Sequence, residues 1–399
     1  MSGLKILLAH NYYLIGGGER QVFAAELSLL RNHGHEVDVY IEDNQRIAEL
    51  GRLHTMARTI WSNETYRNMR NKLRAGQFDV VHVHNFFPLI SPSIYYAAHA
   101  EQIPVVQTLH NFRLLCSNGL LFREGVVCEA CVGRAVTWPG IIHACYRDSR
   151  GGSATVTAMH SFHRAIKTWD RMIDTYIALT EFSRQKFIEG GLPETKIRVK
   201  PNFMTRDPNP GSGQGNYALF VGRLSPEKGV ETLLAAWRLL GDTVPLKIIG
   251  QGPLQDKVAA AAETMPSVDY LGYLENDRVL NIMQDALFLV FPSLLYENFP
   301  MTIVEAFATG LAVLASNLGN SANLVQPWQT GLHFKTGDPT DLAKQAVWLM
   351  NNRDKLMKMR ISARATYEAQ LTPSKNYRIM SEIYQETLKK HEVGVQKGH

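Results

Sequence analysis

The stretch "ALFLVFPSLLYENFPMTIVEAFATGLAVLAS" (residues 286–316) contains two apolar runs separated by a helical segment. The runs "ALFLVFPS" and "LAVLAS" have the length and composition of strands that are buried on both faces. Between them, Pro300 suits the first turn of a helix and Gly310 suits its end. A strand, a helix and a second strand in this order predict a βαβ unit with parallel strands.

The same alternation of apolar runs and amphipathic segments extends over most of the chain. In residues 19–34, for example, Phe23, Leu27 and Leu30 recur on one helical face. The pattern predicts an α/β fold in which helices cover both faces of parallel sheets. The predicted strands are residues 4–10, 36–42, 78–85, 104–111, 175–180, 217–224, 246–252, 268–274, 286–293 and 311–316.

A polar segment rich in proline and glycine divides the chain of 399 residues, a length that suits about two domains. We predict two doubly wound, Rossmann-like domains over residues 1–200 and 216–370, joined by a linker over 201–215. A C-terminal helix over 371–399 is expected to pack back on the first domain. Ligands bind at the carboxyl ends of the strands in such sheets, so two facing domains would form a cleft between those ends.

The net charge of +5 is concentrated in the first 200 residues, which carry 23 Lys and Arg against 18 Asp and Glu. Part of the excess lies in Arg67, Arg70, Lys72 and Arg74. This suggests an anionic partner, either a membrane surface or a phosphorylated substrate, and an ordinary solvated surface is an equal alternative. No nucleic-acid-binding motif accompanies the charge. Without a leader pattern or a spanning apolar run, we expect a cytoplasmic protein with peripheral contact at the inner face of a membrane.

Three adjacent glycines, Gly16, Gly17 and Gly18, join the first predicted strand to the first predicted helix. Adjacent glycines let the backbone approach a phosphate, and the helix start supplies unpaired N–H groups. A dinucleotide fold with Glu42 or Asp43 as the ribose-binding acid is an alternative, although the glycine spacing differs from G-x-G-x-x-G. A plain tight turn is another.

Two further motifs carry charge between a predicted strand and a helix. In "FVGRLSPEKGVETLLAAW" (220–237), Arg223 and Lys228 are placed to bind a diphosphate. In the opening stretch, Glu297 precedes the helix and Glu305 lies inside it. The helix start can donate N–H groups to a phosphate, and Glu305 offers the two acceptor oxygens that a ribose diol needs. Favourable placement of acids near a helix start is the simpler alternative.

In this order, the motifs resemble those of the retaining glycosyltransferases of family 4, which have the two-domain GT-B fold. The resemblance covers nearly the whole chain. It rests on Gly17, Gly18 and Glu19, on His110, on "GRLSPEKG", on "GQGP" (250–253), on the pair Glu297 and Glu305, and on "TGLHFKTGDPTDLA" (330–343).

The resemblance implies transfer of a sugar from a nucleoside diphosphate sugar to a hydroxyl group of a glycan or lipid-linked acceptor, without a catalytic metal or cofactor. It implies catalytic roles for His110 and Glu297. The implied diphosphate-binding residues are Gly16, Gly17, Gly18, Arg223, Lys228, Asn298, Phe299, Met301 and Thr302. The implied ribose-binding and base-binding residues are Glu305, Gly250, Tyr273 and Leu274. Departures at Asn298, Pro300, Leu311 and Asn323 leave the sugar and the base open.

Other functions fit the same fold and stay open at this point. A sugar-nucleotide epimerase would release an altered nucleotide sugar without an acceptor. A phosphorylase would usually carry a cofactor linked to a lysine. A non-catalytic subunit would bind the nucleotide sugar only, although the intact set of charged residues argues against it. Release of nucleoside diphosphate only in the presence of an acceptor would distinguish the transferase from the other three.

The sequence predicts an insert over residues 112–150. It contains all four cysteines, Cys116, Cys128, Cys131 and Cys145, in a stretch of thirty residues. A C-x2-C pair with two outer cysteines can close a four-thiolate structural zinc site, and His143 could replace one ligand. Free buried thiols and a redox or disulfide pair are the alternatives, the latter disfavoured inside cells. The insert follows His110, so we expect it to influence the choice of acceptor.

Overall fold

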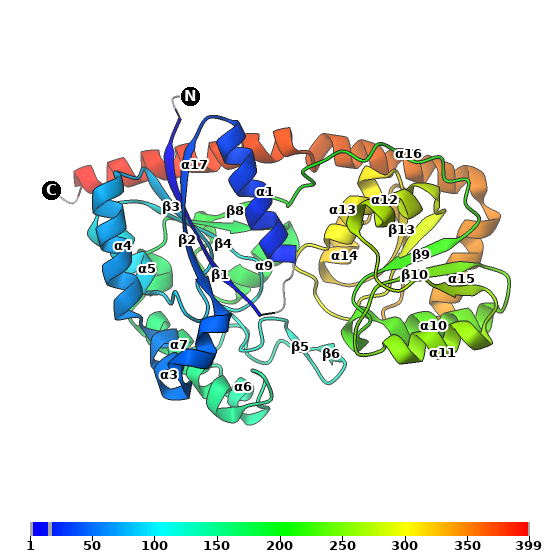
Figure 1. Ribbon diagram of the computed structural model, residues 1–399, viewed down its shortest axis with the longest axis horizontal. Helices are drawn as coiled ribbons and strands as arrows, with labels where there is room; N and C mark the ends of the chain where they lie inside the picture. Colours follow the sequence, from blue (N-terminus) through cyan, green and yellow to red (C-terminus); the bar gives the residue numbers. More distant parts are fainter. Residues whose placement is uncertain (1–2, 15–17, 398–399) are drawn as a thin grey trace. The chain divides into compact units, whose positions relative to one another are not determined.

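The computed structural model describes residues 3–14 and 18–397, which divide into two compact units (Figure 1). Unit 1 comprises Met1–Leu121, Cys128–Asn202 and Pro373–His399, and unit 2 comprises Phe122–Val127 and Phe203–Thr372. Each unit contains a six-stranded parallel sheet with covering helices, so the predicted fold class is confirmed. The predicted insert is split, because its short hairpin β5 (Phe122–Arg123) and β6 (Val126–Val127) is grouped with unit 2.

The sheet of unit 1 has the strand order β2-β1-β3-β4-β7-β8. From β1, which lies between β2 and β3, the chain first adds β2 on one side and then adds the later strands on the other side. In doubly wound sheets such a reversal is the topological switch point where ligands bind. The strands are β1 (Lys5–Tyr12), β2 (Glu36–Asp43), β3 (Val80–Asn85), β4 (Val105–Thr108), β7 (Thr175–Ala178) and β8 (Ile197–Val199).

Helices bury apolar side chains against this sheet. Ile6 and Leu8 of β1 point to one face, since alternate residues of a strand share a face, and there they join Phe23 and Leu30 of α1. The helical segments before α17 are α1 (Gly18–Asn32), η1 (Asn44–Arg46), α2 (Ile47–Leu50), α3 (Arg52–Ile60), α4 (Asn63–Gly76), α5 (Ser93–Ala100), α6 (Trp138–Ile142), α7 (Arg150–Ala165), α8 (Thr168–Arg171), α9 (Glu181–Glu189) and η2 (Glu194–Lys196).

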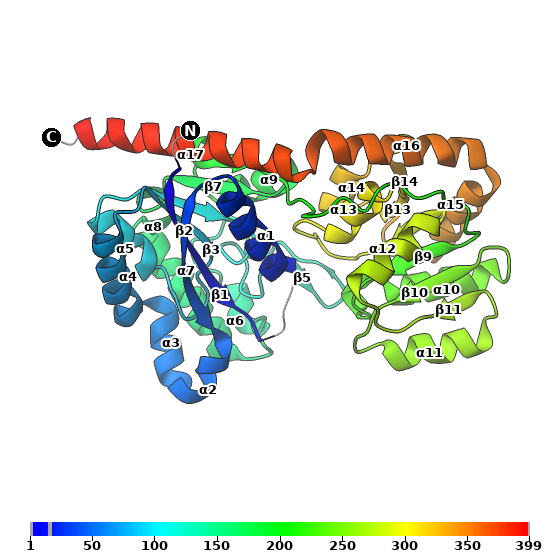
Figure 2. The ribbon, with the colours of Figure 1, turned by 45° about the horizontal axis from the view of Figure 1, so that its top comes forward.

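The C-terminal helix α17 (Pro373–Lys397) belongs to unit 1 and runs along its sheet beside α1 (Figures 1 and 2). Met380, Ile383 and Tyr384 are buried in the same apolar cluster as Ile6 and Phe23. Polar contacts also fix the helix, because Tyr384 Oη lies 2.7 Å from His82 Nδ1 in β3. The last helix is therefore an integral layer of the first unit.

The sheet of unit 2 has the strand order β11-β10-β9-β12-β13-β14, which is the order of the Rossmann fold. All neighbours are parallel, and the switch point falls between β9 and β12. The strands are β9 (Ala218–Val221), β10 (Leu246–Ile249), β11 (Val268–Tyr270), β12 (Phe288–Phe291), β13 (Ala312–Ser316) and β14 (Gly331–Phe334).

The core of unit 2 gathers Phe220 and Ile248 from the sheet with Trp237 of α10 and Ala346 of α15. In Figure 2, α13 lies beside α16. The helical segments are η3 (Pro226–Lys228), α10 (Val230–Leu240), α11 (Gln255–Thr264), α12 (Asn276–Asp285), α13 (Met301–Ala308), α14 (Gly319–Leu324), α15 (Pro339–Asn351) and α16 (Arg353–Gln370).

The predicted linker is an ordered strap on unit 2 from residue 203 onward. The N–H groups of Gly211 and Gly213 donate to the carbonyls of Thr309 and Gln284 at 2.9 and 3.0 Å. Arg360, which is buried, also donates to the carbonyl of Gly211 at 3.3 Å. The glycines of the strap allow it to lie close to the rest of unit 2, because a Cβ atom on Gly211 would meet the Gln284 backbone at 2.0 Å.

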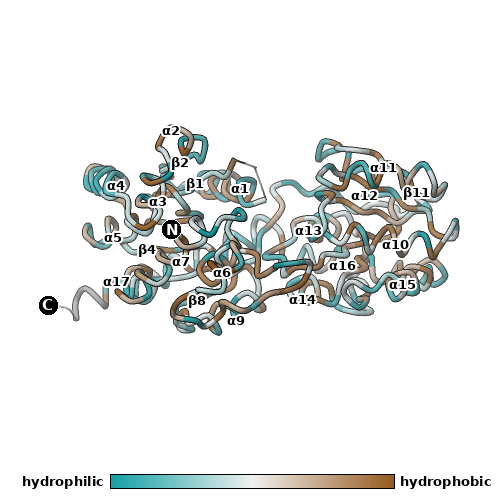
Figure 3. The backbone as a smooth tube through the Cα atoms, turned by 90° about the horizontal axis from the view of Figure 1, so that it is seen from below, coloured by the Kyte–Doolittle hydropathy of each residue, from teal (hydrophilic) through white to brown (hydrophobic). Residues whose placement is uncertain are grey.

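The basic residues of α4 lie on a hydrophilic helix (Figure 3), but most are paired with acids. Arg70 and Arg74 both bind Glu101, at 2.6 and 3.0 Å, and Lys72 binds Asp38 at 2.5 Å. These pairs reduce the positive field that the sequence predicted for this face. Among the described residues, none of the helices combines the length and apolarity needed to cross a bilayer.

Candidate functional site

The loops that follow β9 and β12 meet at the switch point of unit 2. Gly229, at the end of the first loop, has φ +72°, and a Cβ atom there would lie 1.9 Å from the carbonyl oxygen of Pro292. The N–H of Leu294 donates to the carbonyl of Glu227 at 2.9 Å. Glycine at position 229 thus permits the close approach of the two loops that carry the predicted cations and acids.

Lys228 and Glu297, predicted from separate motifs, form an ion pair across these loops. The Nζ atom of Lys228 lies 2.6 Å from Oε1 of Glu297, and both side chains are mostly buried. Ser293 donates its hydroxyl to the same oxygen at 2.8 Å. Asn320 donates its side-chain amide to the backbone carbonyls of Glu297 and Asn298. Lys228 and Ser293 therefore hold the Glu297 carboxylate in one position, and Asn320 of α14 holds the backbone of its loop.

The start of α13 lies directly after these residues and has unused hydrogen-bond donors. Phe299 is buried and Pro300 occupies the N-cap position. Among the described residues, no side chain caps this helix, so the first N–H groups, including those of Met301 and Thr302, can bind an anion. Arg223, on the loop after β9, is exposed.

Glu305 lies one turn further into α13 and is half-buried. Burial raises the pKa of Glu305 to about 7. Within the described part of the chain, its carboxylate forms no hydrogen bond and no ion pair. A desolvated carboxylate without partners is unfavourable, and two donating hydroxyls would satisfy it. This is the chemistry of a ribose diol.

The three remaining predicted residues follow the neighbouring strands β10 and β11. Gly250, at the end of β10, packs so closely on β9 that a Cβ atom would lie 1.9 Å from the Gly222 carbonyl oxygen. Leu274 is half-buried, and Tyr273 is 60% exposed and can cover a ring. The predicted donor residues of unit 2 therefore all follow strands β9 to β12 at the same edge of one sheet.

In unit 1, His110 follows β4 and contacts a buried histidine. Its Nε2 atom lies 2.9 Å from Nδ1 of His84 in β3. Burial, followed by the positive charge of His10, Lys200 and His82, holds the pKa of His110 well below 6.5. His110 is therefore neutral at physiological pH, and its ring can donate one hydrogen bond and accept another.

Of the three predicted loop glycines, Gly16 and Gly17 lie outside the described residues, and Gly18 is the first residue of α1. Glu19 follows, and Asn85 donates to its Oε1 atom at 3.5 Å. Burial raises the pKa of Glu19 to about 7, although Arg113 opposes the shift. The helix start of α1 thus carries a partly desolvated acid.

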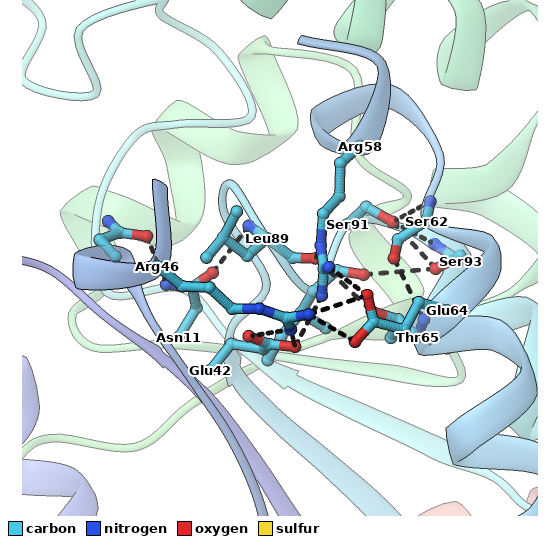
Figure 4. Close-up of polar contacts among 12 residues, drawn as sticks. Asn11, Glu42, Arg46, Arg58, Ser62, Glu64, Thr65, Leu89, Ser91 and Ser93 are labelled. Atoms are coloured by element: carbon cyan, nitrogen blue, oxygen red, sulfur yellow. Dashed lines mark hydrogen bonds and ion pairs between the residues drawn. The ribbon is translucent and has the colours of Figure 1, made fainter. Parts of the chain in front are cut away.

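Both candidate acids of the dinucleotide alternative bind other groups of unit 1. Glu42 binds Arg58 at 2.6 Å and Arg46 at 3.2 Å, as part of a network that includes Glu64 (Figure 4). Asp43 accepts a hydrogen bond from the N–H of Gln45 and caps η1. Both carboxylates stabilise the fold around β2.

None of the four cysteines, all of them within the described residues, forms a disulfide bond in the structure. Burial, followed by the neighbouring Cys116, raises the pKa of Cys131 to about 11, and Cys145 and Cys128 also contribute. The other three thiols therefore lie close enough to Cys131 to influence its ionisation. In the part of the chain that the structure describes, however, no three of the four sulfur atoms lie within 4.8 Å of one another.

Sequence reasoning missed Ser293 and Asn320, which hold the Glu297 loop. A signal was available for Ser293, a hydroxyl residue at the end of a predicted buried strand. Asn320 lies in α14, the short helix after β13, where Asn323 drew attention instead. Asn323 is exposed, whereas Asn320 is buried and donates to two backbone carbonyls.

The elevated pKa of Glu305 predicts a pH-dependent cost to the fold. As pH rises from about 4.5 to about 7, the folded chain keeps a proton that the unfolded chain has lost, so the free energy of unfolding falls. Glu305→Gln lacks this cost. Urea unfolding should show the variant more stable than wild type at pH 8 by on the order of 2–3 kcal/mol, with the two nearly equal at pH 4.5.

The same substitution should weaken stabilisation by an added nucleoside diphosphate, because one of the two charged acceptor oxygens is replaced by an amide donor. Glu263→Gln, at an exposed position of α11, is the control and should alter neither property. If the difference in unfolding free energy between Glu305→Gln and wild type is the same at pH 8 as at pH 4.5, the assignment of a desolvated carboxylate is contradicted.

Comparison with known proteins places the two halves in one family. The model described as Glycosyltransferase Family 4 matches residues 15–207, and the model described as Glycosyl transferases group 1 matches residues 205–366. An uncharacterized glycosyltransferase of Methanocaldococcus jannaschii is 32% identical over 174 residues, which cover 42% of this chain and 49% of that protein. This chain thus spans about half the length of that relative.

Two further proteins are similar over longer stretches. A phosphatidyl-myo-inositol mannosyltransferase of Mycobacterium leprae is 24% identical over 75% of this chain and 71% of that protein. HepE of Anabaena, solved in complex with UDP, superposes with a TM-score of 0.69 and 16% identity over 96% of this chain and all of that one, which shows a shared fold. From the two successive family matches and the paired parallel sheets, the chain belongs to the glycosyltransferases of family 4.

Proposed function

We propose that this protein transfers a sugar from a nucleoside diphosphate sugar to a hydroxyl group of an acceptor, with retention of configuration at the transferred carbon. The observation that carries the proposal is the pairing of Lys228 with Glu297, 2.6 Å apart, beside the uncapped start of α13. A cation and free N–H groups suit a diphosphate, and a fixed carboxylate suits the hydroxyls of a sugar.

In the proposed reaction, the bond between the sugar and the diphosphate breaks and the electron pair leaves with the diphosphate. Arg223, Lys228 and the first N–H groups of α13 stabilise the charge that develops there, which is preorganised electrostatic catalysis without a metal ion. Glu297 binds the transferred sugar and Glu305 binds the ribose. His110 of unit 1 keeps the catalytic role that the family resemblance implies.

Retention through a covalent intermediate would require a carboxylate nucleophile. Glu297 is a poor candidate because its Oε1 atom already accepts from both Lys228 and Ser293. We therefore propose that the acceptor hydroxyl attacks the face from which the diphosphate leaves, and that its proton passes to the leaving phosphate oxygen. The family resemblance implies the same course.

The test is a screen of nucleotide sugars with and without glycan and lipid-linked acceptors, measuring free nucleoside diphosphate. Lys228→Ala and Arg223→Ala should each lose about 2–4 kcal/mol of transition-state stabilisation, or about 30- to 1,000-fold in turnover. Lys257→Ala is a matched control, because Lys257 pairs with Glu231 on the exposed surface of the same unit. Its turnover should equal that of wild type.

Near wild-type turnover in Lys228→Ala would reject the phosphate-binding role. Release of an altered nucleotide sugar without acceptor would favour an epimerase, and phosphate-dependent release of a sugar phosphate would favour a phosphorylase. Binding of nucleotide sugars without any turnover would favour a non-catalytic subunit.

We propose that the acceptor is lipid-linked or a glycan built at the inner face of a membrane. The proposal draws support from the name of the Mycobacterium leprae relative and from the positive excess in the first 200 residues. Because the bases of α4 are largely paired, contact should be weak and lost at high salt. Liposome flotation should show binding to anionic vesicles at low salt only. Equal binding to neutral vesicles, or none at all, would favour a soluble acceptor.

We also propose that the four cysteines hold a structural zinc ion. All four fall in one short segment, the other three all influence the pKa of Cys131, and thiolates in a tetrahedral set suit this metal. Metal analysis should find about one zinc per chain, lost in Cys131→Ser together with thermal stability, because the binding free energy supports the fold. The exposed His143 supplies the control, since His143→Ala should retain the metal. Four thiols that titrate freely in metal-free native protein would reject the site.

A further inference from the structure

Unit 1 contains a line of buried polar side chains that the proposed reaction does not use directly. Lys200, which follows β8, and Glu26, in α1, are both 0% exposed, and Nζ of Lys200 lies 2.5 Å from Oε1 of Glu26. The second carboxylate oxygen, Oε2, lies 3.5 Å from Nε2 of His84. His84 in turn contacts His110 at 2.9 Å. The line therefore runs from a buried cation to the proposed catalytic histidine.

This ion pair requires an explanation other than stability. Removing two charges from water costs several kcal/mol each, and a buried pair often stabilises a fold no better than apolar side chains of similar volume. Phe23 and Leu30, on the same face of α1 as Glu26, show that the position borders the apolar core. An acid and a base kept there point to a use for the charge.

A metal site does not explain the cluster, although Glu26, His82 and His84 bring ligand atoms within 4.8 Å of one another. The ammonium group of Lys200 already binds Glu26. Both ring nitrogens of His82 are engaged at 2.7 Å, Nδ1 with the hydroxyl of Tyr384 and Nε2 with that of Thr108. A cation would have to displace these partners.

The positions of the protons on His84 and His110 follow from the negative charge of the Glu26 carboxylate. Burial is the main cause that lowers the pKa of His84 well below 6.5, so its ring is neutral and carries one proton. Oε2 of Glu26, 3.5 Å from Nε2, does not form a hydrogen bond with it in the structure, but its negative charge favours the proton on that nitrogen. Nδ1 of His84 is then an acceptor, and His110 donates to it from Nε2. The neutral His110 ring consequently carries its lone pair at Nδ1.

We propose that Glu26 is a positioning residue, which sets the tautomer of His84 and, through it, the tautomer of His110, so that His110 presents Nδ1 to its ligand as a hydrogen-bond acceptor. Lys200 keeps the carboxylate in place. The inference rests on the proposed function for the role of His110, whereas the tautomers themselves do not depend on it.

The substitution Glu26→Gln makes the proposal testable because it changes one atom without changing volume. Lys200 retains the amide oxygen as its acceptor, which turns the amide nitrogen toward Nε2 of His84. Nε2 of His84 must then accept a hydrogen bond from the amide, so the proton of His84 moves to Nδ1. His84 now donates to Nε2 of His110, and the proton of His110 moves to Nδ1 as well. Both histidines should switch tautomer together.

The measurement is the ¹⁵N shift of the ring nitrogens in protein labelled at histidine, since protonated and unprotonated ring nitrogens give distinct signals. Signals of His110 are assigned by their loss in His110→Gln. Wild type should show protonated Nε2, and Glu26→Gln should show protonated Nδ1, with turnover lower by about tenfold or more. Inhibition by nucleoside diphosphate should stay within about twofold of wild type.

Tyr384→Phe is the matched control, because it removes a partner of His82 from the same cluster but leaves Glu26, His84 and His110 intact. It should lower thermal stability and change neither the His110 signals nor turnover. Unchanged His110 signals in Glu26→Gln would overturn the proposal, even if turnover fell. If the tautomer switches but no donor and acceptor pair gives turnover in wild type, the proposed function fails and the positioning role stands.

Discussion

Burial of parallel strands on both faces is the constraint on which the site of unit 2 depends. Such a sheet exposes its backbone groups and polar loops only at the strand ends, and the order β11-β10-β9-β12 separates two of those loops at the switch point. Lys228 and Glu297 lie on these loops, after β9 and β12. The fold therefore brings together a cation and an acid that are 69 residues apart in the chain.

The acid before α13 and the acid inside it have different electrostatic surroundings. Before the helix, Glu297 is neutralised by Lys228 and held by Ser293, so it can orient a ligand at little cost. Inside the helix, Glu305 has no partner in the described structure, and burial raises its pKa to about 7. The strain of an isolated carboxylate is a feature expected at a binding position, where a ligand supplies the missing hydrogen bonds.

Apolar periodicity was sufficient to predict the central strands, because Ile6–Leu8 and Phe288–Phe291 are buried on both faces. It missed β8 and β14, which are short edge strands with mixed burial. The segment predicted as a linker became a strap because its glycines allow close packing, an effect that composition alone does not distinguish from flexibility.

The positions of the charged candidates at strand ends could also be predicted, whereas their roles in a site stay predictions. The contacts that these residues make with one another could not be predicted. Glu26 occupies the apolar face of α1 beside Phe23 and Leu30, which was a visible signal of a buried acid. Its partners Lys200 and His84 are distant in sequence, and only the packing of β3 and β8 against α1 brings them together.

The central claim is that the start of α13 and the loop after β9 together bind a nucleoside diphosphate. Amide hydrogen exchange, followed by mass spectrometry with and without UDP, ADP or GDP, tests it most directly, because bound phosphate oxygens protect the N–H groups that hold them. The account predicts slower exchange over residues 222–229 and 299–303 with at least one of these nucleotides. Protection confined to unit 1, with no change in these two segments at saturating nucleotide, would contradict it.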